Sequence, residues 1–73
     1  MAETASSTRL LLNGAPTSVP GRTTVARLLS ERGLAIDRVA VEVNRTIVAK
    51  QDYAQRELAD GDVVEIVSFV GGG

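Results

Sequence analysis

The run of residues 63–70 constrains the fold more than any other stretch, and it passes without a linker into Gly71-Gly72-Gly73. Val, Ile or Phe fill six of the eight positions of this run, which favours a buried β-strand. Asp60-Gly61-Asp62 precedes the run and is a turn signal. Glycine lacks Cβ and adopts backbone angles that are closed to other residues. We therefore expect a rigid strand that presents a short tail, with the α-carboxylate of Gly73 about 10 Å beyond the strand when the tail is extended.

Length and composition predict one small domain and exclude several kinds of chemistry. The chain has 73 residues, and its 44% apolar content suffices for a small core. It contains neither Cys nor His, which excludes disulfides, zinc sites with Cys or His ligands, and thiol or imidazole catalysis. We expect no metal site and no bound cofactor.

Charge and hydropathy bear on partners and location. The net charge of −1 gives no electrostatic reason for binding nucleic acid or an anionic membrane. No apolar run is long enough to span a membrane, and residues 1–7 do not resemble a secretory signal. We expect a cytoplasmic protein with neither nucleic-acid nor membrane partners.

The first half of the chain predicts a hairpin and then a helix. Strands at residues 8–12 and 15–19 flank Asn13-Gly14, a strong hairpin signal, and Pro16 puts the second strand at a sheet edge. A helix follows from about Thr24, its predicted N-cap, to Arg32. Its apolar stripe consists of Val25, Leu28 and Leu29, and Gly33 is suited to the position just past its end.

The second half predicts strands again. Residues 38–43 alternate, with Val39, Val41 and Val43 on one face, and a short strand is expected at 46–48. Residues 49–59 show no period, and Tyr53 and Leu58 are the predicted anchors of this segment. By composition we expect the last strand to be the most buried, so we place it in the middle of the sheet, paired with the first.

The predicted fold class is therefore α+β, a mixed sheet with one helix packed across it. We divide the chain into a disordered lead-in at residues 1–7, a domain at 8–70 and a flexible glycine tail at 71–73.

At this level of detail the chain resembles the ubiquitin-like β-grasp sulfur carriers, in particular the ThiS-like carriers of bacterial thiamine (thiazole) biosynthesis. The resemblance covers nearly everything from Leu10 onward, and its most specific part is the ending at residues 65–73. The lead-in is a departure, since such carriers usually begin at the first strand. The other matching segments are Leu12-Asn13-Gly14, Thr24-Val25 with Leu28-Leu29, residues 41–48, Tyr53, Leu58 and Asp60-Gly61-Asp62.

The resemblance implies a carrier and not an enzyme. A ThiF-like (E1-like) adenylyltransferase would use ATP-Mg²⁺ to adenylate Gly73, a sulfur donor system would convert the adenylate to a thiocarboxylate, and a ThiG-like thiazole synthase would take the sulfur. Activation is needed because a terminal carboxyl group is an anion at neutral pH and a poor electrophile. Gly71 and Gly72 would thread a narrow channel in the partner.

We also predict a partner-binding surface on the open face of the sheet. If Val64 faces the helix, Val67 and Phe69 face away from it, and Leu11 of the first strand joins them. These three side chains form an exposed apolar patch, which usually indicates a partner site. Val70, beside the tail, is a further predicted partner-binding residue. The alternative is that residues 49–59 cover the patch.

Other functions remain open at this stage. A small subunit of a molybdopterin-type (MoaD-like) synthase has a similar fold and a diglycine end, although no Pro precedes the tail here. A ubiquitin-like protein modifier is a further alternative, although the lone Lys50 leaves little scope for self-linked chains. The last alternative is a plain binding module with an inert, frayed tail.

Overall fold

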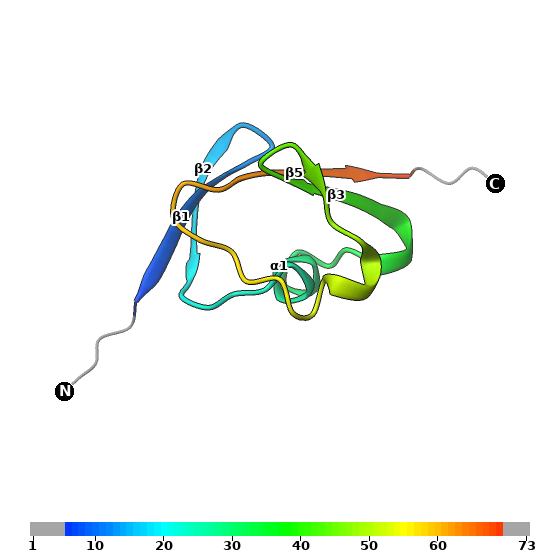
Figure 1. Ribbon diagram of the computed structural model, residues 1–73, viewed down its shortest axis with the longest axis horizontal. Helices are drawn as coiled ribbons and strands as arrows, with labels where there is room; N and C mark the ends of the chain where they lie inside the picture. The colour runs from blue at the N-terminus through cyan, green and yellow to red at the C-terminus, as the bar shows by residue number, and fades with distance from the viewer. Residues whose placement is uncertain (1–5, 70–73) are drawn as a thin grey trace.

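The computed structural model describes residues 6–69 (Figure 1). Two 3₁₀ turns, at Ile36–Arg38 and Lys50–Asp52, interrupt the loops. The main elements, in chain order, are β1 (Ser7–Leu12), β2 (Ala15–Pro20), α1 (Val25–Glu31), β3 (Val39–Val43), β4 (Thr46–Ile47) and β5 (Val63–Ser68).

The five strands form one mixed sheet in the order β2-β1-β5-β3-β4. β5 runs parallel to β1, with Leu11 opposite Val63, and antiparallel to β3, with Val41 opposite Ile66. Figure 1 shows α1 lying on one side of this sheet. The prediction of an α+β fold with the last strand in the centre, beside the first, is confirmed.

Both β-hairpins turn on residues with left-handed backbone angles. Asn13 and Gly14 have φ values of 50° and 84°, and Asn44 and Arg45 have values of 54° and 69°. Such angles at both central residues match the twist of the flanking strands, and Asn and Gly tolerate them best. The hairpin predicted at Asn13-Gly14 is confirmed, and so is the edge position of β2.

The helix begins and ends where the sequence predicts. The Thr24 hydroxyl accepts a hydrogen bond from the backbone N–H of Arg27 at 3.1 Å, which satisfies one amide of the first turn. At the other end Gly33 has φ 70°, and the N–H of Leu34 donates to the carbonyl of Leu29 at 2.9 Å. This is the Schellman arrangement, in which a left-handed residue lets the chain fold back on the last turn.

The core lies between α1 and the sheet. It receives the apolar stripe of the helix and the inward residues of four strands, and both predicted loop anchors are buried in it. The buried apolar residues are Leu10, Leu12, Val19, Val25, Leu28, Leu29, Val39, Val41, Val43, Tyr53, Leu58 and Val64.

Three expectations are corrected. Ser7 belongs to β1, opposite Pro20, so it is part of the sheet and not of a lead-in. β5 is central but not the most buried strand: Val64 is its only fully buried residue, whereas three of the five residues of β3 are buried. The last strand ends at Ser68, whereas the sequence predicts a strand over residues 63–70, and Val70 and the tail lie outside the described residues.

Candidate functional site

The two faces of β5 differ sharply in exposure. Val64 is completely buried against α1, whereas Val67 and Phe69 are 59% and 54% exposed on the opposite face. Because side chains alternate along a strand, the covered face holds the strand in the domain and the other face remains open. β5 thus combines a fixed position in the sheet with an apolar surface next to the predicted tail.

The predicted apolar patch is divided in two. Leu11 is 40% exposed and lies opposite Val63, at the start of β5, whereas Val67 lies opposite Ala40 of β3. Val67 lies four positions after Val63, which is about 13 Å along a strand. Leu11 therefore faces the open side as expected but does not lie together with Val67 and Phe69.

Two carboxylates occupy the middle of the open face. Glu42 of β3 lies directly opposite Glu65 of β5, and Ile47 of β4, which is 65% exposed, lies opposite Glu42. Like charges in opposite positions destabilise a sheet slightly. Sequence reasoning missed this pair, because the outward position of each residue is visible in the alternation but their pairing depends on the register.

Residues 49–59 do not cover this face. Backbone carbonyls of Tyr53 and Arg56 accept hydrogen bonds from Ala26 and Val25 at 2.9 Å, which ties the segment to the first turn of α1. The N–H of Leu58 donates to the carbonyl of Thr23 at 2.9 Å. The alternative in which this segment shields the patch is therefore wrong.

Two asparagine side chains hold β5, one at its first residue and one at its fourth. The Asn44 Oδ1 atom accepts a hydrogen bond from the N–H of Val63 at 2.9 Å. The Asn13 side chain binds both backbone groups of Ile66: its Oδ1 atom accepts from the N–H at 2.7 Å and its Nδ2 atom donates to the carbonyl at 3.3 Å. The sequence shows these residues only as turn formers, because their partners lie 19 and 53 positions away.

The turn before β5 is a hydrogen-bonded structural unit. The Asp60 Oδ1 atom accepts from the N–H of Arg9 at 2.8 Å. Asp62 is buried, and its two carboxylate oxygens accept from the Asn44 Nδ2 atom at 2.9 Å and the N–H of Ala59 at 2.8 Å. Through these hydrogen bonds, Asp60 and Asp62 stabilise the turn.

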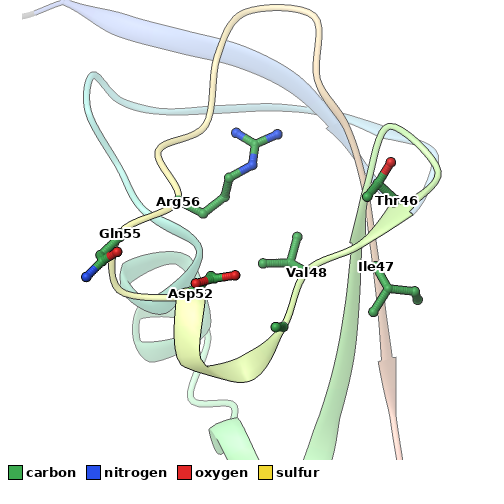
Figure 2. Close-up of a pocket in the computed structure, with 7 residues that line it drawn as sticks. Thr46, Ile47, Val48, Asp52, Gln55 and Arg56 are labelled. Atoms are coloured by element: carbon green, nitrogen blue, oxygen red, sulfur yellow. The ribbon is translucent and has the colours of Figure 1, made fainter.

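A hollow with a volume of about 340 Å³ lies between β4 and residues 49–56 (Figure 2). Figure 2 shows the Arg56 and Val48 side chains pointing toward this space, with Thr46 at its rim. Among the described site residues, Leu11, Val67 and Phe69 do not line it, and the Arg56 Nη1 atom already donates to the backbone carbonyl of Glu57 at 2.6 Å.

Within residues 6–69, no three His, Cys, Asp or Glu side chains come together as a metal site would require. No helix in the same range combines the length and apolar character needed to cross a membrane. The predicted tail residues Gly71, Gly72 and Gly73, and Val70 before them, lie outside the described part of the chain.

Comparison with known proteins relates this geometry to a family. The model of the ThiS family matches residues 10–73. The chain is 48% identical over 50 residues to the sulfur carrier protein ThiS of Bacillus subtilis, covering 68% of this chain and 76% of that protein.

The chain is also 46% identical over 65 residues to a thiazole synthase of Paramagnetospirillum magneticum, covering 89% of this chain and 20% of that protein. It thus spans about a fifth of the length of the thiazole synthases that it matches.

A solved structure shares the fold. The crystal structure of the thiamine biosynthesis protein ThiS from Geobacter metallireducens matches with a TM-score of 0.72 and 35% identity, covering 89% of this chain and 99% of that one. The expected β-grasp, with its mixed five-stranded sheet and one helix, is therefore confirmed. From the sequence match and the shared fold together, this chain belongs to the ThiS family.

Proposed function

We propose that the protein is a sulfur carrier for thiamine thiazole synthesis and that the sulfur is carried at the C-terminal carboxyl group of Gly73. The observation that carries the proposal is the family match, which extends through the last glycine. The structure adds a strand held on both sides, β5, as the support of the tail. With no Cys in the chain, a main-chain carboxyl group is a suitable place for sulfur.

The proposed chemistry has three steps. A carboxylate oxygen of Gly73 attacks the α-phosphorus of ATP, bound with Mg²⁺ on a ThiF-like adenylyltransferase, and pyrophosphate leaves. The outer sulfur of a persulfide on the donor system then attacks the carbonyl carbon and expels AMP, which gives an acyl disulfide. A thiol finally attacks the donor's sulfur of this S–S bond, so that a disulfide forms on the donor side and the thiocarboxylate of Gly73 leaves. This protein supplies the reacting group and its position, and its partners supply the catalysis.

The proposed acceptor of the sulfur is a ThiG-like thiazole synthase. The similarity of this chain to one part of larger thiazole synthases supports that pairing, because it places a related domain and a synthase in one polypeptide. A cytoplasmic location remains a prediction, and it agrees with reactions that consume ATP.

The open face of the sheet is the proposed docking surface for the adenylyltransferase. Val67 and Phe69 provide an exposed apolar area at the tail end of β5, and Leu11 with Val63 provides a second one at the other end. Exposed apolar patches of this kind usually mark partner sites. Docking through this face would bring Val70 and the glycines toward the partner's active site.

Mass spectrometry tests the proposal. Incubated with its ThiF-like adenylyltransferase, ATP-Mg²⁺ and a sulfur donor, the intact protein should gain the mass of one sulfur in place of one oxygen, at Gly73. Two matched variants serve as controls, one lacking Gly72 and Gly73 and one extended by a residue after Gly73. Both should fold normally and stay unmodified. Sulfur uptake by either control would refute the terminal carrier, and transfer of the intact chain onto lysines of other proteins would favour a modifier instead.

A further inference from the structure

β1 supports only the first part of β5. The two strands are in register at two positions, Leu11 opposite Val63 and Leu12 opposite Val64. The backbone N–H of Asn13 then donates to the carbonyl of Val64 at 2.8 Å, and the chain turns away into the hairpin. From Ile66 onward, β5 has no main-chain partner on its β1 side among residues 6–69.

The Asn13 side chain takes the place of the missing strand. Its carboxamide accepts from the N–H of Ile66 at 2.7 Å and donates to the carbonyl of the same residue at 3.3 Å. One amide thus pairs with both groups of one residue, as a neighbouring strand would. On the other side β3 continues, with Val39 opposite Ser68 and the N–H of Phe69 donating to the carbonyl of Arg38 at 2.7 Å.

Asparagine suits this position for two reasons. Its backbone has φ 50°, a conformation that Asn tolerates better than most residues other than Gly. Its side chain carries a donor and an acceptor on two separate atoms, whereas an ionised Asp lacks the donor, Gly lacks both groups, and Ser has one oxygen for both roles. The orientation of the amide follows from its two bonds, since only one assignment satisfies both backbone groups of Ile66.

From this geometry we infer that Asn13 is a positioning residue for the tail reaction: it fixes the direction in which β5 leaves the domain and so where the Gly73 carboxylate arrives. The inference rests on the proposed function. Without the Asn13 amide, the end of β5 is held along its β3 edge alone. The tail then samples a wider range of directions, and fewer docked complexes place the carboxylate in reach of ATP. Small displacements of a reacting group lower rates strongly.

Asn44 provides a matched control. It also lies in a hairpin turn with a positive φ, 54°, and its side chain also holds β5, but at Val63 and not near the tail. Replacing each with Gly keeps the backbone conformation accessible and removes the side-chain hydrogen bonds. Asn13→Gly and Asn44→Gly should therefore both lower stability, while only the first should disturb the tail.

The first measurement is the kinetics of adenylation, followed by ATP–pyrophosphate exchange with the cognate ThiF-like adenylyltransferase. For Asn13→Gly we expect kcat to fall about tenfold, and KM for the carrier to stay within about twofold, because the docking face is intact. Asn44→Gly should leave both constants within about twofold of the unmodified chain. Asn13→Asp, which retains the acceptor for the Ile66 N–H, should fall between Asn13→Gly and the unmodified chain.

The second measurement needs no partner. In the free protein, the NMR order parameters of the Ser68 and Phe69 amides should drop in Asn13→Gly and remain unchanged in Asn44→Gly. Equal kinetics and equal order parameters for the two glycine variants would overturn the inference. If Asn13→Gly does not fold, Asn13→Asp takes its place in both measurements. Kinetic constants and order parameters equal to those of the unmodified chain would then refute a role for the Asn13 donor.

The two proposals fail in different ways. If the unmodified chain is not adenylated at all, the proposed function is wrong. If the unmodified chain is adenylated normally and Asn13→Gly is too, the carrier function stands and the positioning role is refuted.

Discussion

Val64 and Val67 are the same residue type on the same strand, three positions apart, yet the first is completely buried and the second is 59% exposed. The odd spacing puts them on opposite faces of the sheet, one under α1 and one on the open side. The covered face supplies the apolar burial that stabilises a small domain. The open face carries apolar side chains that contribute little to folding, and so it remains available for binding.

Substitution of the two valines tests this contrast directly and should give the largest effect. Val64→Ala should lower the free energy of unfolding by about 2 kcal/mol or more, because it removes buried methyl groups and leaves a cavity. Val67→Ala should cost less than about 1 kcal/mol, since its side chain is largely in water already. Urea denaturation measures both, and equal losses would mean that the two faces are not distinct.

A second substitution tests whether the open face of the sheet binds a partner. Phe69→Ala should weaken binding to the adenylyltransferase by about 2 kcal/mol, as loss of a desolvated aromatic side chain at an interface does. The same change should leave the denaturation midpoint nearly unaltered. Titration calorimetry measures the affinity. The control is Gln55→Ala, a change in the segment that packs beside α1, which should leave the affinity unchanged if the loss is specific to Phe69. Undiminished affinity of the Phe69 variant would remove this residue from the interface.

The smallest effect concerns the carboxylate pair of the open face. Glu65→Lys should raise the free energy of unfolding by about 0.5 kcal/mol, because it replaces a repulsion across from Glu42 with an attraction. Glu65→Gln removes the repulsion alone and should give a smaller gain. Both gains should shrink in high salt, which screens exposed charges. A loss of stability in either variant would show that the two carboxylates do not repel each other in the folded protein.

Local signals predicted most of the fold. Period-3.6 and period-2 patterns identified α1 and β3, and Thr24, Gly33 and Asn13-Gly14 marked boundaries by their own backbone or side-chain chemistry. Such features depend on neighbours in sequence, so one chain is enough to recognise them. The strong β-propensity of β5 likewise predicted its central place.

Features that depend on register were harder to predict. The separation of Leu11 from Val67 follows from the pairing of Leu11 with Val63, and nothing within either strand specifies that pairing. The side-chain hydrogen bonds of Asn13 with Ile66 and of Asn44 with the buried Asp62 also join residues that lie far apart in the chain. The hydrophobic run of β5 also misled the prediction of burial, because a central strand of an antiparallel or mixed sheet can keep one face open.

The parallel pairing of β1 with β5 has a consequence for biosynthesis. β5 lies between β1 and β3 and is the last strand in the chain, so the two halves of the sheet have no bond to each other until it is in place. A nascent polypeptide that has not yet delivered residues 63–68 from the ribosome cannot close the domain. Long-range closure of this kind is slow compared with helix formation. Folding of the sheet therefore waits for β5, and an incomplete translation product lacking β5 is left open to proteolysis.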